Sequence, residues 1–127
     1  MRKVVKTENA PMPVAPYSQA IIANGFVYTA GQLGTDMAAG KLADGVEEQA
    51  RFALTHVKSI LEAAGSDMNH IVKTTVFLDN IDDFGKVNAV YGTFFNDEPP
   101  ARSAIEVARL PLGAVVEIEV VALLKAP

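Results

Sequence analysis

The feature that most constrains the fold is an amphipathic stretch over residues 46–64. Its apolar side chains recur at three- and four-residue spacing, which gathers them on one face of an α-helix. Asp44 and Glu47 have the spacing of a capping box, so we expect the helix to begin at Asp44, and Gly65 is a typical left-handed cap at its end. The apolar face comprises Val46, Ala50, Ala53, Leu54, Val57, Ile60, Leu61 and Ala64. Because such a helix must bury this face, a second layer of structure has to cover it.

The segment before this helix has strand character. Asn24-Gly25 separates two β-prone runs and is a strong signal for a tight hairpin, because both residues tolerate positive φ. We therefore expect strands at 18–22 and 26–30, followed by a loop over 31–40. Three prolines favour an irregular arm over residues 1–16 that lies on the domain.

The segment after the helix repeats the alternation of strand and helix. Residues 71–78 alternate in polarity and are rich in β-branched side chains, which predicts a strand. A second helix is expected from Asp82, and strands are expected at 102–109 and 115–124. The predicted buried face of the second helix comprises Phe84, Val87, Val90, Tyr91, Phe94 and Phe95.

The predicted order is β-β-α-β-α-β-β within a single domain of residues 1–127. A strand after each helix implies crossover connections, so the fold class is α/β (α+β), with one mixed sheet and both helices on one face. In the last strand Val116, Ile118, Val120, Ala122 and Leu124 form an apolar face that matches the helices. Glu117, Glu119, Val121 and Leu123 form the opposite face, acidic at one end and apolar at the other.

That opposite face predicts an oligomer. The chain is 50% hydrophobic and only 20% charged, which is more apolar than a soluble monomer of this size needs. No apolar run approaches the roughly 20 residues of a membrane-spanning helix, so the excess is not explained by a membrane. We expect the uncovered face of the sheet to be buried against another copy of the chain.

Composition also narrows the compartment and the partners. The basic N-terminus is not followed by an apolar core of signal-peptide length. The sequence has no cysteine, which excludes disulfides and thiol catalysis, so a cytoplasmic protein is expected. A net charge of −4 argues against a nucleic-acid partner, because phosphate binding usually needs a basic face.

Several kinds of active site are excluded by the residue pattern. His56 and His70 are isolated in different elements, so neither a metal cluster nor a serine-hydrolase site is expected, and a glycine-rich nucleotide loop is missing. Arg102 is more informative, because it opens an alternating strand beside small residues that leave room for bidentate carboxylate binding. Taken alone, an arginine in such a position is more often an ordinary surface or ion-pair arginine.

Glu117 and Glu119 share one face of the last strand with apolar residues. Partial burial would raise the pKa of such a carboxyl and let it transfer protons near neutral pH, although a solvated strand face would explain the pair as well. If the last two strands form a symmetric hairpin, Arg102 and Glu117 stand about 20 Å apart in one chain. A site that uses both residues must then lie between subunits.

Two segments near the C-terminus form a specific signature, namely residues 100–111 (PARSAIEVARLP) and 116–119 (VEIE). Weaker matches in the same order lie at 7–11, 16–19, 31–32, 62–65, 71–77 and 87–91. Together, over nearly the whole chain, they resemble the RidA (YjgF) family of imine deaminases.

The resemblance implies a chorismate-mutase-like fold and a homotrimer with a site in each cleft between subunits. It implies hydrolysis of 2-iminobutanoate and 2-iminopropanoate to 2-oxo acids and ammonia, with no cofactor and no metal. By the same resemblance, Arg102 binds the substrate carboxylate and Glu117 activates the attacking water. Tyr17, Asn88 and the backbone at Gly31 would line the pocket.

Position 30 departs from the family, whose members commonly carry serine at this substrate-binding position. Ala30 removes a hydroxyl contact that Thr29 or a water would have to replace. Alternative functions therefore stay open. One is deamination of another enamine or imine, such as an aminoacrylate or an aminomuconate. Another is RNA cleavage or translation inhibition, since some relatives are called endoribonuclease L-PSP, and a third is binding of a small ligand without turnover.

Overall fold

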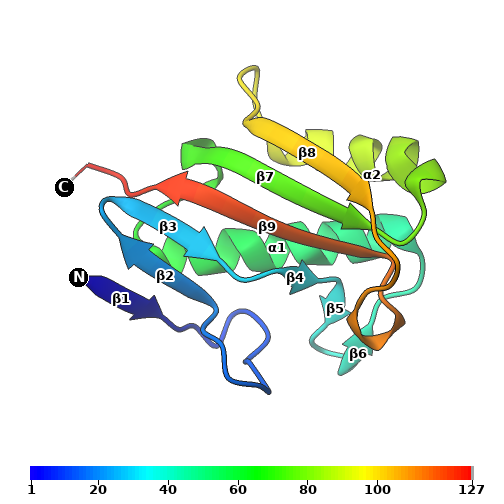
Figure 1. The fold of residues 1–127 in the computed structure, drawn as a ribbon, viewed down its shortest axis with the longest axis horizontal. Helices are drawn as coiled ribbons and strands as arrows, with labels where there is room; N and C mark the ends of the chain where they lie inside the picture. The colour runs from blue at the N-terminus through cyan, green and yellow to red at the C-terminus, as the bar shows by residue number, and fades with distance from the viewer. Residues whose placement is uncertain (127) are drawn as a thin grey trace.

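The computed structural model describes residues 1–126 as two layers, a mixed β-sheet and two α-helices on one of its faces (Figure 1). The helices are α1 (Val46–Ala64) and α2 (Phe84–Tyr91). The strands are β1 (Arg2–Val5), β2 (Ala20–Ala23), β3 (Phe26–Thr29), β4 (Gln32–Leu33), β5 (Thr35–Asp36), β6 (Lys41–Leu42), β7 (Ile71–Leu78), β8 (Ala101–Glu106) and β9 (Val116–Leu123). The α+β class and the placement of both helices on one face are as predicted. Neither helix is long and apolar enough to cross a bilayer.

The sheet runs in the order β1-β2-β3-β9-β7-β8, and β4 also pairs with β9. β7 and β8 are parallel, since α2 carries the chain back between them, and β9 is antiparallel to β3, β4 and β7. The predicted loop over 31–40 contains β4 and also β5, which forms a separate small hairpin with β6. β9 therefore lies in the middle of the sheet and positions its side chains on both faces.

The hydrophobic core lies between the sheet and the helices. In β9 the side chains of Val116, Ile118, Val120 and Ala122 are at most 2% exposed. The predicted apolar face of α1 packs toward them, and most of it is fully buried. No helix covers the other face of the sheet (Figure 1). The alternate residues of β9, among them Glu117, point to that face. The division of β9 into a helix-facing side and an open side is thus confirmed.

The last two strands do not form the predicted hairpin. β8 and β9 each pair with β7, which lies between them. The connection over 107–115 is longer than the roughly two to five residues of a hairpin loop, so it can pass around the end of β7. Two backbone bonds hold it there, from the Val107 N–H to the Leu78 carbonyl at 2.9 Å and from the Asp79 N–H to the Val115 carbonyl at 3.1 Å.

Residues 1–16 are more ordered than the predicted irregular arm. β1 pairs with β2 along the edge of the sheet, a short strand whose polar residues give little sequence signal. Beyond it, the Gln19 side chain, 1% exposed, holds the arm. Its Oε1 accepts a hydrogen bond from the Thr7 N–H at 2.7 Å, and its Nε2 donates to the carbonyls of Thr7 and Pro11 at 3.0 and 2.9 Å. This buried amide fixes the segment that leads to Tyr17.

The turns and helix ends agree with the sequence only in part. Asn24-Gly25 has φ angles of 51° and 81°, as a tight hairpin requires, and Gly65 caps α1 in the left-handed conformation with φ 89°. The capping box at Asp44 and Glu47 is wrong, because Gly45 stands at the N-cap and no side chain caps the helix. α2 is shorter than predicted, since 3₁₀ turns occupy 81–83 and 92–94.

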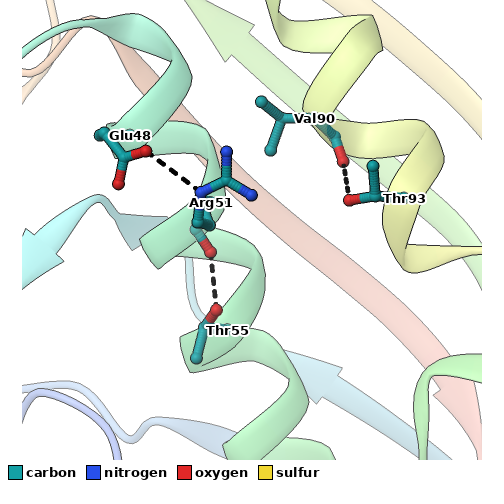
Figure 2. Close-up of polar contacts among 5 residues, drawn as sticks. All are labelled: Glu48, Arg51, Thr55, Val90 and Thr93. Atoms are coloured by element: carbon teal, nitrogen blue, oxygen red, sulfur yellow. Dashed lines mark hydrogen bonds and ion pairs between the residues drawn. The ribbon is translucent and has the colours of Figure 1, made fainter.

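Local polar contacts lie along the helices (Figure 2). In α1, Arg51 Nε lies 3.2 Å from Glu48 Oε1, and Thr55 Oγ1 donates to the Arg51 carbonyl at 2.8 Å. Just beyond α2, Thr93 Oγ1 donates to the Val90 carbonyl at 2.6 Å. Each contact joins residues three or four positions apart, so these bonds support single helices rather than the packing of the layers.

Candidate active site

Arg102 lies near the start of the edge strand β8 and points toward α2. Its Nη1 donates a hydrogen bond to Asn88 Oδ1 at 2.7 Å. Its guanidinium carbon lies 4.7 Å from the centre of the Tyr91 ring and 5.1 Å from that of Phe84. In α2, Asn88 lies four positions after Phe84 and three before Tyr91, so the three side chains share one face of the helix. Together they hold a half-buried cation.

A cavity of about 420 Å³ opens beside this arginine. The residues that line it are Asn88, Tyr91, Gly92, Phe95, Asn96, Pro99, Pro100 and Arg102. In residues 1–126 no carboxylate lies within 4.0 Å of the guanidinium, which therefore keeps N–H donors for a ligand. Its planar fork suits a bidentate carboxylate. We call Asn88, Tyr91 and Arg102 the arginine half-site.

Glu117 lines a second cavity, of about 470 Å³, which opens on the uncovered face of the sheet. The residues around it are Val14, Tyr17, Ala30, Gly31, Leu33, Pro111, Leu112 and Glu117. The Glu117 carboxyl lies directly over Gly31, where a β-carbon would overlap it. This close approach of a carboxyl to the backbone requires a residue without a side chain. We call Tyr17, Ala30, Gly31 and Glu117 the glutamate half-site.

The electrostatics of the glutamate half-site favour proton transfer. Burial raises the pKa of Glu117, and the neighbouring charge of Glu119 raises it further. A carboxylate with a raised pKa is a stronger base, and it can accept a proton from a bound water at a pH closer to neutrality.

The two half-sites of one chain lie on opposite faces of the sheet. Across β7, Thr74 is level with Arg102 and Phe77 is level with Glu117. Thr74 is fully buried toward the helices, whereas Glu117 alternates with the buried residues of β9. Two strand spacings and an offset of three residues place the Cα atoms of Arg102 and Glu117 about 14 Å apart. The separation of Arg102 and Glu117 predicted from a hairpin, about 20 Å, is therefore wrong. The two residues are closer, but their side chains lie on opposite faces of the sheet.

The predicted site residues accordingly fall into two groups. Arg102 and Asn88 come together in one cavity, and Tyr17, Ala30, Gly31 and Glu117 come together in the other. Arg102 thus provides a cation with free N–H donors in one cavity, and Glu117 provides a candidate base in the other.

The model of a family described as Endoribonuclease L-PSP matches residues 7–124. The chain belongs to the endoribonuclease L-PSP family. The RidA (YjgF) resemblance of the sequence is thereby confirmed, and one of the similar solved structures carries the RidA name.

Family members match the chain along almost its full length. A mouse protein named 2-iminobutanoate/2-iminopropanoate deaminase is 48% identical over 96% of this chain and 91% of its own. RidA from the Antarctic bacterium Psychrobacter superimposes with a TM-score of 0.92 at 39% identity, covering 96% of this chain and 99% of that one. Escherichia coli TdcF, crystallised with bound serine, has a TM-score of 0.92 at 37% identity, covering 97% and 99%.

Ala30 lines the glutamate half-site, where the sequence predicted a missing hydroxyl contact that Thr29 or a water could replace. Thr29 does not replace it, because its Oγ1 accepts a hydrogen bond from the Val120 N–H at 3.0 Å. Successive residues of a strand point to opposite faces, so the Thr29 side chain lies on the helix side. The cavity wall at position 30 is therefore a methyl group.

The histidines lie outside both half-sites. His56 is 3% exposed, its Nε2 lies 2.7 Å from the Thr35 carbonyl, and burial lowers its pKa. His70 Nδ1 pairs with Asp67 Oδ1 at 2.6 Å. In the part of the chain that the structure describes, no group of three or more His, Cys, Asp and Glu residues is arranged to hold a metal ion.

The helical spacing of Phe84 and Tyr91 predicted core positions for both and did not indicate their contact with Arg102. Phe84 is in fact 38% exposed, and its ring lies over the guanidinium. The signal that could have revealed this is the spacing of Phe84, Asn88 and Tyr91, which puts one amide and two rings on a single helix face. Without knowing that α2 lies beside β8, the same spacing indicates only burial.

Proposed function

We propose that this chain hydrolyses 2-iminobutanoate and 2-iminopropanoate to 2-oxo acids and ammonia. The observation that carries the proposal is the guanidinium of Arg102, half-buried and without a carboxylate partner in residues 1–126, as a receptor for a small anionic substrate must be. The raised pKa of Glu117 supplies the matching base. The deaminase name of the mouse relative, at 48% identity, supports the same reaction.

In the proposed reaction Arg102 binds the substrate carboxylate and so fixes the position of the adjacent C=N carbon. Glu117 holds a water and takes its proton as the new C–O bond forms, which gives a neutral carbinolamine from the protonated imine. Glu117 then returns this proton to the nitrogen. The C–N bond breaks as the hydroxyl group gives its own proton to Glu117 and from there to solvent, so that ammonia leaves and the 2-oxo acid remains. Positioning and one acid–base group are enough, because the protonated imine carbon is already electrophilic.

The proposal includes assembly, because the two half-sites of one chain face away from each other. A substrate of this size can contact Arg102 and Glu117 together only if the two residues come from different subunits. The open face of the sheet, which carries Tyr28, Ile105, Val121 and Leu123, supports burial against another copy. We propose a homotrimer, in which head-to-tail contacts close a ring of three equivalent sites.

A ribonuclease is the main alternative, because the family description names one. We favour the deaminase, since both histidines lie outside the half-sites and the net charge is −4. A nuclease assay with Arg102→Ala as a control separates the two, because contaminating nuclease would not respond to that substitution. Turnover of other imines, such as aminoacrylate, decides whether Ala30 has changed substrate preference.

The test is release of 2-oxobutanoate from 2-iminobutanoate generated in situ by a threonine dehydratase, with semicarbazide competing for the imine. Wild type should accelerate release, and Arg102→Ala and Glu117→Gln should each abolish most of the acceleration, by about 100-fold for the base. Arg51→Ala and Glu48→Gln on α1 are matched charge controls that should behave as wild type. Folded wild-type protein that gives no acceleration would make the substrate assignment wrong.

A further inference from the structure

The surroundings of Arg102 are unusual for an arginine that binds a ligand. In the described residues it has no ion-pair partner, yet three side chains of α2 hold it. Asn88 uses one N–H at 2.7 Å, and the rings of Phe84 and Tyr91 lie 5.1 and 4.7 Å from the guanidinium carbon. An aromatic face attracts a cation without neutralising its charge. The N–H groups in the plane of the guanidinium do not donate hydrogen bonds to the rings. The edge of the fork therefore stays available for a carboxylate.

Thr74 and Phe95 hold the ring of Tyr91, the nearer of the two rings, in place. Tyr91 Oη and Thr74 Oγ1 lie 2.8 Å apart, and Thr74 is fully buried in β7. Thr74 is also the residue of β7 that stands level with Arg102 in β8. Phe95 packs against the Tyr91 ring at 4.6 Å between centroids. Burial raises the pKa of Tyr91, so the ring stays a neutral phenol and offers Arg102 no competing anion at neutral pH.

We propose that Phe84 and Tyr91 are positioning residues that orient the Arg102 guanidinium for the substrate carboxylate, with the Tyr91–Thr74 hydrogen bond setting the place of the Tyr91 ring. The rings act through Arg102 and do not touch the reacting atoms. The inference rests on the proposed function, because it assumes that Arg102 binds a carboxylate. The affinity of Arg102 for the carboxylate then depends on the aromatic faces of Phe84 and Tyr91.

The experiment compares Phe84→Leu, Tyr91→Leu and Tyr91→Phe with wild type. Leucine keeps an apolar side chain but removes the ring face, whereas phenylalanine keeps the ring and removes only the bond to Thr74. Phe52→Leu on α1, whose ring stacks near His56 instead, is the matched aromatic control. Each protein is first shown by circular dichroism to be folded at the assay temperature.

Binding of 2-oxobutanoate is measured by calorimetry, and KM and kcat are measured with 2-iminobutanoate. Each leucine variant should weaken 2-oxobutanoate binding and raise KM by about three- to fivefold, with kcat within about twofold of wild type. Tyr91→Phe should recover only part of the loss, because it keeps the ring but removes the bond to Thr74 that places it; full recovery would show that this bond does not position the ring. Binding of the uncharged analogue 2-oxobutanamide should not respond, since it lacks the carboxylate.

A spectroscopic readout removes the dependence on turnover. In protein with ¹⁵N-labelled arginine, the Arg102 Nε–H signal, assigned by its loss in Arg102→Ala, should be shifted by the ring currents in wild type. The shift should diminish in both leucine variants and persist in Phe52→Leu.

The positioning role of Phe84 and Tyr91 and the proposed deaminase function can fail separately. If wild type binds 2-oxobutanoate and Arg102→Ala does not, but both leucine variants bind as wild type with an unmoved Nε–H signal, the positioning role is wrong and the function stands. If wild type neither binds 2-oxobutanoate nor turns over 2-iminobutanoate, both are wrong.

Discussion

The opposed half-sites predict that two inactive variants restore each other. Arg102→Ala destroys the arginine half-site and leaves Glu117 intact, and Glu117→Gln does the reverse. If each site joins Arg102 of one chain to Glu117 of another, a mixed oligomer contains some sites in which both residues are wild type. If both residues of a site came from one chain, mixing would produce no intact site.

The expected yield follows from counting. In a randomly assembled equimolar mixture, half of the sites receive an intact Arg102 and, independently, half receive an intact Glu117. About one quarter of the sites are therefore intact, whatever the size of the closed ring. The same counting applies to wild type mixed with the double variant, where activity should fall from about one half to about one quarter of the wild-type value as subunits exchange.

The assay unfolds the two variants together in guanidinium chloride, refolds them by dilution and follows 2-oxobutanoate release. Each variant refolded alone, and wild type treated in the same way, define zero and full activity. Size-exclusion chromatography with light scattering shows that the mixture has reassembled. Reassembled mixtures no more active than the separate variants would refute the shared site, and so would a double-variant mixture that stays at about one half.

The remaining predictions concern the glutamate half-site. The acid limb of kcat/KM should lie above the usual carboxyl range near pH 4.3, because the raised pKa of Glu117 means that the carboxylate base is lost at a higher pH than usual as pH falls. Glu119→Gln should move that limb to lower pH without restoring the usual value, since burial is the larger cause. Gly31→Ala should lower kcat at least tenfold, because the new β-carbon displaces the Glu117 carboxyl. Gly85→Ala in α2 is the control, since a β-carbon there meets open space. It should keep activity and raise the free energy of unfolding in denaturant titrations by up to about 1 kcal/mol. Ala30→Ser places a hydroxyl in the cavity wall, and comparison of several imines should show a change in their relative kcat/KM. Identical ratios would show that position 30 does not select substrates.

The sequence was sufficient for the elements whose signals are local. The stripe of α1, its Gly65 cap, the Asn24-Gly25 turn and the alternation of β7 and β9 all depend on neighbouring residues, and each is present where expected. The one-sided layering followed from the order of the elements, because a strand after each helix leaves little choice of topology. β1 escaped detection, since a short edge strand needs neither apolar alternation nor turn residues.

The candidate site was predicted as a set of residues but not as an arrangement. Arg102 and Glu117 stood out by chemistry and by family resemblance, whereas Phe84 and Tyr91 looked like ordinary core residues. Their contact with Arg102 depends on α2 lying beside β8, which no local pattern encodes.

The sequence predicts the alternation of side chains within a strand, whereas the pairing of strands is known only from the tertiary structure. Side-chain alternation determines which face of β9 each residue occupies, because it is a property of one strand. Which strand lies beside β9 depends on the free energy of the whole sheet, including the crossover through α2. The sequence alone therefore determined that Glu117 faces away from the helices. Only the tertiary structure, by inserting β7 between β8 and β9, decided that Arg102 and Glu117 of one chain stand on opposite sides of the sheet.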